Sequence, residues 1–300
     1  MVLGKTATYL VIVLIAVTVA SLHGATTEPP HLNVAGRDVA IWKPVGPTPV
    51  TGYPLIVFSH GLTGCNTQSV FLMEALARAG YYVIAPNHND ATCGSAKGRS
   101  FRDRMRNIHP QQPLREPSKW SPDTYRDRYE DIEVVLNEVL RNKQFAGVPI
   151  DANRIGIAGH SLGGYTALGV SGGWSSWKDP RVKAVLALSP HCSPFVDHGD
   201  LNLGIPVMFQ GGTADFGETP IVRRSGGAYD RSSAPKYYIE LDGAGHFAWT
   251  DLNPKYQQAI DEYSVAFFDR YLKGVGPNPL TPLMQTPLPK GVSAVRFKID

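Results

Sequence analysis

Two serines of this sequence lie at the centre of a Gly-x-Ser-x-Gly motif, Ser161 in GHSLG and Ser171 in GVSGG. The motif is typical of a nucleophile elbow, a sharp strand-to-helix turn that exposes a serine hydroxyl. A serine hydroxyl becomes an effective nucleophile only when a base takes its proton and an acid orients that base. The motifs therefore predict acyl transfer only if a histidine and a carboxylate can join one of the two serines.

Ser161 has the context that an elbow requires. The stretch RIGIAG before it predicts a strand, and the residues after it favour a helix, whose N-terminus brings positive potential to the hydroxyl. Small residues are needed around so tight a turn, and Gly159, Gly163 and Gly164 meet that need. Ser171 has no strand before it and is expected at the far end of the same helix. We predict Ser161 as the nucleophile; the alternative is a Ser-Gly turn without chemistry.

The base and the acid follow from chain order, which in this architecture runs serine, acid, histidine. Asp215 comes directly after the predicted strand IPVMFQGG, and His246 lies in the loop after the predicted strand PKYYIELDG. Glycines at 243 and 245 allow that loop to present the ring. The competing acids are Asp242, Asp251 and Glu218, and the competing histidines are His191 and His88.

The tetrahedral intermediate of acyl transfer needs backbone donors for its oxyanion. One predicted donor is the N–H of Leu162, the residue after the nucleophile. The other is the N–H of Leu62, in the loop SHGLTG that follows the predicted strand PLIVFSH. The Leu62 side chain matters less than its backbone group.

The loops of Ser161, Asp215 and His246 can meet only if the strands before them lie side by side in one sheet. Val-, Ile- and Leu-rich runs alternate with amphipathic helices along the chain, which predicts an α/β fold with a mostly parallel sheet covered on both faces. In such sheets ligands bind at the carboxyl ends of the strands, where the loops of Ser161, Asp215 and His246 all begin.

Three helices are the clearest. The first runs through NTQSVFLMEALARAG with a cap at Asn66 or Thr67, the second covers Thr124–Asn142, and the last begins near Asn253 and ends at Gly274. Residues 88–124 are polar and rich in Pro and Arg, so we expect a long loop or small insertion beside the site. The Pro-rich tail, 275–300, receives no assignment.

The N-terminus predicts export. Lys5 precedes the apolar run Tyr9–Ala20, and small residues follow, so residues 1–25 are expected to be a cleaved signal peptide and 26–300 a single catalytic domain. The alternative is a membrane anchor, for which the run is short. We expect a secreted or periplasmic protein with no stable anchor.

Export bears on the three cysteines, because disulfides persist outside the cytosol. Cys65 and Cys93 each follow a predicted strand, and their loops meet if those strands are neighbours, so we predict a Cys65–Cys93 bridge. The alternative is three buried free thiols.

Composition excludes several classes. A net charge of +3, spread along the chain, does not indicate a nucleic-acid partner. The sequence contains no metal-ligand set and no nucleotide-binding loop, so we expect no metal and no cofactor. Oligomeric state is left open.

The motifs FSHGLTG, GHSLGG, GGTAD and GAGHF occur in this order between residues 55 and about 271. The chain resembles the α/β-hydrolase superfamily and, within it, the dienelactone-hydrolase-like group. It is most similar there to platelet-activating-factor acetylhydrolase-like enzymes and to bacterial cutinases and polyester hydrolases. The resemblance implies Ser161, Asp215 and His246 as a triad, with Leu62 and Leu162 as oxyanion donors.

Two residues depart from these relatives. Dienelactone hydrolases use a cysteine nucleophile where this chain has Ser161, so their reaction is not implied. Polyester hydrolases usually carry an aromatic residue in the oxyanion loop, where this chain has Leu62. That difference argues for weaker activity on aromatic polyesters.

We predict a serine carboxylesterase that acts on a small-molecule or polymeric ester. No long apolar lid interrupts the strands after Ser161, which favours short or medium acyl groups. The open alternatives are an amidase or peptidase with the same triad and a silent binding protein on the same fold. Aromatic and polar candidates for the substrate pocket are Tyr53, His88, Trp174, Trp177, Phe216 and Trp249.

Overall fold

The computed structural model describes residues 28–92, 110–141, 143–199, 201–274, 276 and 278–300. The predicted signal peptide and Cys93 lie outside the described residues. Within them the strands are β1 His31–Val34, β2 Arg37–Trp42, β3 Tyr53–Ser59, β4 Tyr82–Pro86, β5 Gln144–Phe145, β6 Val148–His160, β7 Val182–Leu188, β8 Val207–Gly212, β9 Lys236–Leu241 and β10 Val292–Lys298.

The helices alternate with the strands as the sequence pattern predicts. The α-helices are α1 Val70–Arg78, α3 Arg126–Leu140, α4 Leu162–Leu168, α5 Ser193–His198, α6 Thr219–Arg223, α7 Ala228–Arg231 and α8 Gln257–Phe268. Short helical turns are η1 Pro117–Lys119, η2 Gly169–Gly173, η3 Ser175–Trp177, η4 His246–Trp249, η5 Pro254–Tyr256, η6 Asp269–Lys273 and η7 Thr281–Met284.

One sheet organises the molecule, in the order β1-β2-β4-β3-β6-β7-β8-β9-β10, with β5 paired to β6. The strands from β4 to β9 are parallel, and Val57 pairs with Ile157 in the central β3–β6 register. The pairs β1–β2, β2–β4 and β9–β10 are antiparallel. The sheet is therefore mixed, with the predicted parallel arrangement at its centre.

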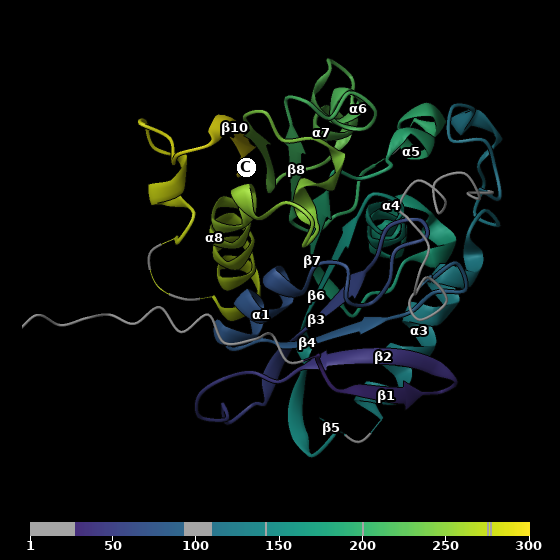
Figure 1. Cartoon of the computed structure of the whole chain (residues 1–300), viewed down its shortest axis with the longest axis vertical. Coiled ribbons are helices and arrows are strands. Elements are labelled where there is room, and N and C mark those ends of the chain that lie inside the picture. Colours follow the sequence, from purple (N-terminus) through teal and green to yellow (C-terminus); the bar gives the residue numbers. More distant parts are fainter. Residues whose placement is uncertain (1–27, 93–109, 142, 200, 275, 277) are drawn as a thin grey trace, which may run out of the picture.

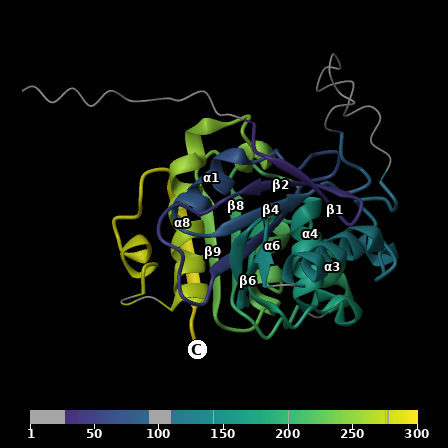
Figure 2. The ribbon, with the colours of Figure 1, turned by 90° about the horizontal axis from the view of Figure 1, so that it is seen from below.

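Helices cover both faces of the sheet, α1 and α8 on one side and α3 and α4 on the other (Figures 1 and 2). Alternation along the strands supplies both layers of core, because neighbouring side chains point to opposite faces. In β3, Leu55 and Val57 belong to the core under α3 and α4, and Ile56 and Phe58 to the core under α1 and α8.

The start of α1 differs from the sequence prediction. The helix begins at Val70, and neither Asn66 nor Thr67 caps it. The carboxylate of Asp251 accepts the N–H groups of Val70 (2.9 Å) and Phe71 (3.1 Å) instead. A carboxylate at this end is stabilised by the helix dipole, which explains why a residue 180 positions away can replace a local cap.

The C-terminal tail ends in β10, which pairs antiparallel with β9 and closes that edge of the parallel sheet (Figure 1). The last helical segment ends as predicted at Gly274, which adopts φ 63° as its cap. Among the described residues, no helix has the length and apolar character needed to cross a membrane.

Candidate active site

Ser161 occupies the sharp turn between β6 and α4. Its backbone has φ 56° and ψ −119°, a conformation that non-glycine residues rarely adopt. A Cβ at Gly163 would overlap the carbonyl oxygen of Ser59, and one at Gly159 would overlap the carbonyl oxygen of Gly163. The two glycines are therefore required by close backbone approach, and the turn has the geometry of a nucleophile elbow.

The structure brings Ser161, His246 and Asp215 together from three loops at the carboxyl edge of the sheet. His246 Nε2 lies 2.8 Å from Ser161 Oγ, a normal hydrogen-bond distance. His246 Nδ1 lies 3.4 Å from Asp215 Oδ1, which is an ion-pair distance and long for a hydrogen bond. For Nε2 to accept the Ser161 proton, the neutral ring must carry its own proton on Nδ1.

Ser189, directly after β7, lies between the histidine and the aspartate. Its Oγ donates to Asp215 Oδ2 at 2.5 Å and lies 2.8 Å from His246 Nδ1. With its own proton on Asp215, the Ser189 oxygen is free to accept the Nδ1 proton of His246. Asp215 therefore interacts with His246 both directly and through the Ser189 hydroxyl. The bridging role of Ser189 was not predicted from the sequence.

Asp215 is 4% exposed. Burial raises its pKa, but the contact with the His246 ring, the hydrogen bond from Ser189, the charge of His246 and a hydrogen bond from Thr219 outweigh burial and lower it to about 2. The Thr219 hydroxyl donates to Asp215 Oδ2 at 3.1 Å. Asp215 is therefore a carboxylate at neutral pH, the form that can stabilise a protonated imidazole.

The loop after β3 approaches the nucleophile. A Cβ added at Gly61 would lie 3.4 Å from Ser161 Cβ. In the described part of the chain, the backbone N–H groups of Leu62 and Leu162 have no hydrogen-bond acceptor, whereas the neighbouring Gly61 and Thr63 N–H groups are both bonded. Two free donors beside a serine are what an oxyanion hole requires.

His160, the residue before the nucleophile, joins the loops of the site. Its Nε2 donates to the carbonyl oxygen of His246 at 2.7 Å, and its Nδ1 accepts from Gln68 at 3.0 Å. Gln68 Oε1 in turn accepts the Gly61 N–H at 2.9 Å. Burial and then the nearby His246 lower the pKa of His160 to about 3, so its ring is neutral.

The competing acids make other contacts. Asp251 caps α1, and Asp242 accepts a 3.5 Å hydrogen bond from Thr213. Glu218 lies 3.0 Å from His191 Nδ1, so it pairs with that histidine and not with His246. The competing histidine His191 is therefore bonded to a carboxylate outside the triad.

Ser171 lies in η2, at the far end of the helix that Ser161 opens, as predicted. It is 2% exposed, and its hydroxyl has no hydrogen-bond partner among the described residues. A buried hydroxyl without a base has no route to nucleophilic chemistry.

A second serine, histidine and aspartate share hydrogen bonds in the core. Ser59 Oγ lies 2.8 Å from His88 Nε2, and His88 Nδ1 lies 2.9 Å from Asp131 Oδ2. Ser59 is 0% exposed, and burial and then the charge of Arg128 lower the pKa of His88. No ester can reach this serine, so the prediction that His88 lines the pocket is wrong.

Four more pocket predictions fail for the same reason, burial. Tyr53 begins β3, at the opposite end of that strand from the site, and donates to the Gly46 carbonyl. Trp174 and Trp249 are buried and donate to Tyr165 and Gln210. Trp177 is buried and donates to the Pro122 carbonyl.

Two exposed phenylalanines directly follow members of the triad in the sequence, and the Phe247 ring lies 5.4 Å from the His246 ring. Phe216 follows Asp215 and is 83% exposed, and Phe247 follows His246 and is 39% exposed. Phe216 is among the predicted pocket residues; Phe247 is not, although its position directly after the predicted base is visible in the sequence.

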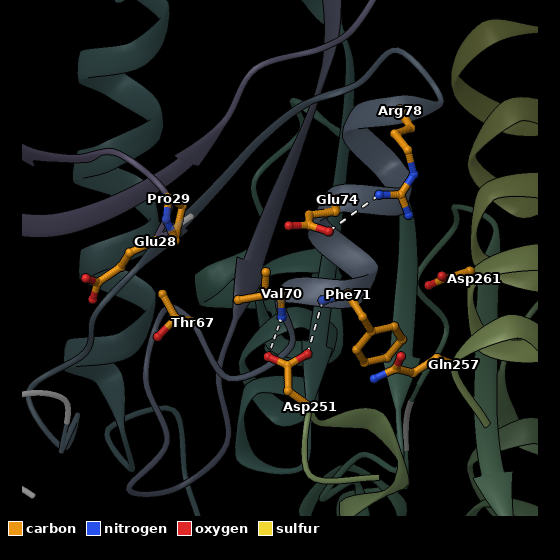
Figure 3. Close-up of a pocket in the computed structure, with 10 residues that line it drawn as sticks. All are labelled: Glu28, Pro29, Thr67, Val70, Phe71, Glu74, Arg78, Asp251, Gln257 and Asp261. Atoms are coloured by element: carbon orange, nitrogen blue, oxygen red, sulfur yellow. Dashed lines mark hydrogen bonds and ion pairs between the residues drawn. The ribbon is translucent and has the colours of Figure 1, made fainter. Parts of the chain in front are cut away.

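A cavity of about 610 Å³ lies elsewhere, where α1 faces α8 (Figure 3). Its lining includes Glu74, Arg78, Asp251 and Asp261, and it contains none of Ser161, His246 and Asp215. The hydrogen-bond geometry, and not this cavity, locates the reacting groups.

Cys65 forms a disulfide, and Cys192 is a buried free thiol. Cys93, the partner that the sequence predicts, lies outside the described residues. The segment 88–124 is described at its two ends, where it contains η1 and the buried Trp120.

The chain is similar to known ester hydrolases. A family model described as PET hydrolase-like matches residues 122–275, and one described as platelet-activating factor acetylhydrolase, isoform II, matches residues 36–145. Cutinase 1 of Thermobifida cellulosilytica is 26% identical over 223 residues, which cover 73% of this chain and 69% of the relative.

Two further cutinases give similar values. Cutinase of Thermobifida fusca (strain YX) is 26% identical, and Cutinase est2 of Thermobifida alba is 27% identical. Each alignment covers 73% of this chain and 60% of the relative. The PET hydrolase-like model spans more than half of the chain, and the mixed sheet carries helices on both faces. The chain therefore belongs to the PET hydrolase-like family, carboxylic ester hydrolases with an α/β-hydrolase fold.

Proposed function

We propose that this protein is an exported serine esterase that uses Ser161 as nucleophile, His246 as base and Asp215 as orienting acid. The observation that carries the proposal is the 2.8 Å contact between His246 Nε2 and Ser161 Oγ, on a strained turn with two free N–H donors beside it. The hydroxyl thus has a base within reach and a place for the developing charge.

The reaction follows from these contacts. Ser161 Oγ attacks the ester carbonyl carbon while its proton moves to His246 Nε2. The carbonyl oxygen becomes an oxyanion, which accepts hydrogen bonds from the N–H groups of Leu62 and Leu162. Collapse expels the alcohol, which takes the proton from His246 and leaves an acyl group on Ser161. Water then repeats the sequence and releases the acid.

Asp215 and Ser189 act on the protonated imidazole. When His246 carries both protons, its Nδ1–H faces the Ser189 oxygen at 2.8 Å and Asp215 Oδ1 at 3.4 Å. The ionised aspartate stabilises the imidazolium. Because the Ser189 hydroxyl donates its own proton to Asp215, its oxygen is oriented to accept the Nδ1–H of His246.

The substrate class is an ester with a short or medium acyl group, including lipid or polyester substrates. The names of the relatives support this choice, since they are cutinases and the matching families are PET hydrolase-like and platelet-activating factor acetylhydrolase. Phe216 and Phe247 supply exposed apolar surface for the acyl or alcohol portion. We infer one catalytic domain, residues 26–300, after cleavage of the leader.

The disulfide at Cys65 supports export, because such bonds persist in oxidising compartments. We propose Cys93 as its partner and a secreted or periplasmic location.

Labelling with a fluorophosphonate probe tests the nucleophile directly. We expect one covalent adduct per chain, located on Ser161 by peptide mass spectrometry, and turnover of p-nitrophenyl butyrate well above that of the matching anilide. An adduct on another serine, or no adduct, would overturn the assignment. Faster turnover of the anilide would make the protein an amidase with the same residues.

A further inference from the structure

Arg128 is a fully buried charge that the reaction scheme does not use. It lies on α3 with 0% exposure. Its Nη2 donates to both carboxylate oxygens of Asp90 at 2.8 Å, and its Nε donates to Asp90 Oδ1 at 3.1 Å. A buried guanidinium is costly unless its donors are satisfied, so these contacts must be well formed in the folded protein.

Arg128 also donates to Ser59 Oγ at the end of β3, at 3.5 Å, and to the loop that follows this strand. Nη1 donates to the carbonyl oxygen of His60 at 2.8 Å, and Nη2 donates to the carbonyl oxygen of Gly61 at 3.2 Å. The Gly61 oxygen also lies 2.8 Å from His60 Nδ1 and accepts the Gly64 N–H at 3.0 Å. The direction of this carbonyl is therefore fixed by three donors.

Fixing the Gly61 carbonyl also fixes the Leu62 N–H. The two groups belong to one trans peptide unit, in which C=O and N–H point in opposite directions. With the oxygen drawn toward α3, the Leu62 N–H is directed away from α3. Gly61 itself borders the nucleophile, since a Cβ there would lie 3.4 Å from Ser161 Cβ.

Asp90 fixes the peptide unit that follows Leu62. Its Oδ2 accepts the Thr63 N–H at 2.9 Å, and Thr63 has the strained φ of 56°. Burial raises the pKa of Asp90, but Arg128 outweighs burial and lowers it to about 2, so the pair is ionised at neutral pH. The peptide units on both sides of Leu62 are thus attached to one ion pair.

We propose that the Arg128–Asp90 ion pair positions the Leu62 N–H as an oxyanion donor. Neither residue touches substrate; both act through the backbone of residues 60–63. The inference rests on the proposed function, because it assigns these residues a role in the same reaction. It predicts that loosening the pair weakens binding of the tetrahedral state more than binding of the ester.

The test uses Arg128→Lys and Asp90→Asn in the full chain. Lysine cannot hold two carbonyls and a carboxylate in the fork geometry of arginine. Asparagine keeps an oxygen for the Thr63 N–H but loses the charge that faces Arg128. Asp90 has 22% side-chain exposure, so Asp90→Asn decides the question if Arg128→Lys does not fold.

The chain offers a matched control pair at the opposite end of the sheet. Arg154 donates to Asp151 at 2.7 Å and to the Gly52 carbonyl at 2.7 Å, the same kinds of contact without any link to Ser161. Arg154→Lys and Asp151→Asn therefore measure what loss of such an ion pair does to the fold alone.

Turnover of p-nitrophenyl butyrate is measured per active site, together with the Ki of an alkyl trifluoromethyl ketone, which forms a tetrahedral adduct with the nucleophile. Deleting one oxyanion donor lowers kcat by about 10²–10³, so a displaced donor should lower it by about tenfold to a hundredfold. We expect that fall in both test variants, with KM within about twofold and Ki rising in parallel with the loss of kcat/KM. Both controls should keep kcat within about twofold.

Equal kcat values in test and control variants overturn the inference, as does a fall in kcat without a matching rise in Ki. Failure of the proposed function looks different: the wild type then hydrolyses no ester, or Ser161→Ala retains turnover. If the wild type is active and Ser161→Ala is not, the proposed function stands. The Arg128 and Asp90 variants then test only whether this ion pair positions the Leu62 N–H.

Discussion

His160 donates a hydrogen bond from Nε2 to the backbone carbonyl oxygen of His246, across 2.7 Å. Through Gln68, the same imidazole is connected to the Gly61 N–H in the oxyanion loop. Three loops that carry the nucleophile, the base and a proposed oxyanion donor are thus joined by side chains that do not react. His160, the residue between Gly159 and Ser161 in the elbow motif, therefore helps to hold these three loops together.

Replacing Gln68 by methionine should damage this connection while keeping the side-chain volume. The change leaves the Gly61 N–H and His160 Nδ1 without their partner, and each unsatisfied buried group costs about 1–3 kcal/mol. We expect a lower free energy of unfolding in urea and a kcat reduced by about tenfold or more, because both loops lose a constraint. Gln258→Met, which removes an exposed bond to Glu262, serves as control. Equal kcat values for the two variants would contradict the role of Gln68.

Acid should destabilise the protein partly through His160. The folded-state pKa of His160 is about 3, because burial and then His246 lower it, whereas an unfolded histidine has a pKa of about 6.5. Between these values the unfolded state binds more protons, so the free energy of unfolding falls as pH falls. One such group removes about 2 kcal/mol between pH 8 and pH 5.

His160→Gln isolates that contribution, since glutamine can still donate to the His246 carbonyl but does not titrate. Urea unfolding at pH 8 and pH 5 should show a smaller loss of stability in the variant than in the wild type. The variant keeps the part of the loss that comes from His60 and His88, whose pKa values burial and then Arg128 also lower. An identical loss in both proteins would show that His160 does not resist protonation.

Much of the architecture could be predicted because its signals are local. Apolar runs predicted the parallel strands, and the small residues around Ser161 predicted the elbow. Its glycines are required because their backbones lie close to Ser59 and to each other. The order of acid and histidine along the chain predicted Asp215 and His246, and the fold brings both to the carboxyl edge of the sheet. The strand and elbow signals lie in residues that are adjacent in the sequence, and the order of Ser161, Asp215 and His246 along the chain is equally visible there.

The remaining features depend on contacts between distant segments. Asp251 caps α1 from 180 positions away, and β10 is a strand because β9 offers it an edge. Ser189 and Arg128 have no motif around them; their importance comes from partners on other elements. The aromatic pocket residues failed because an aromatic residue is as useful in the core as at a site, and most of those named are in the core.

Asp215 and Glu218 can be separated by mutation. Asp215→Asn removes the charge beside His246 and favours the wrong tautomer, which lowers kcat by up to about 10⁴-fold in such triads. Glu218→Gln alters only the contact with His191, so its kcat should stay within a few-fold of wild type. The measurement is kcat for p-nitrophenyl butyrate at pH 8. If Glu218→Gln shows the larger loss, Glu218 is the orienting acid.

Phe216 should influence acyl-chain preference. Phe216 follows Asp215 in the sequence and is 83% exposed, and we propose that its ring covers the apolar chain of a bound ester. Phe216→Ala is expected to raise KM for p-nitrophenyl octanoate several-fold and to change KM for the acetate little, because only the longer chain reaches the ring. Val50→Ala removes a fully exposed apolar side chain away from the site and provides the control. The same change in KM for both esters would exclude a chain contact.

The most direct test of the central claim compares Ser161→Ala with Ser171→Ala on p-nitrophenyl esters from acetate to palmitate. The Ser171 hydroxyl is buried and without a hydrogen-bond partner among the described residues, so its removal should leave folding and turnover unchanged. Ser161→Ala should abolish turnover of every ester while retaining the wild-type unfolding midpoint. Turnover that survives in Ser161→Ala, or that is lost in a folded Ser171→Ala, would contradict the assignment of Ser161 as the nucleophile.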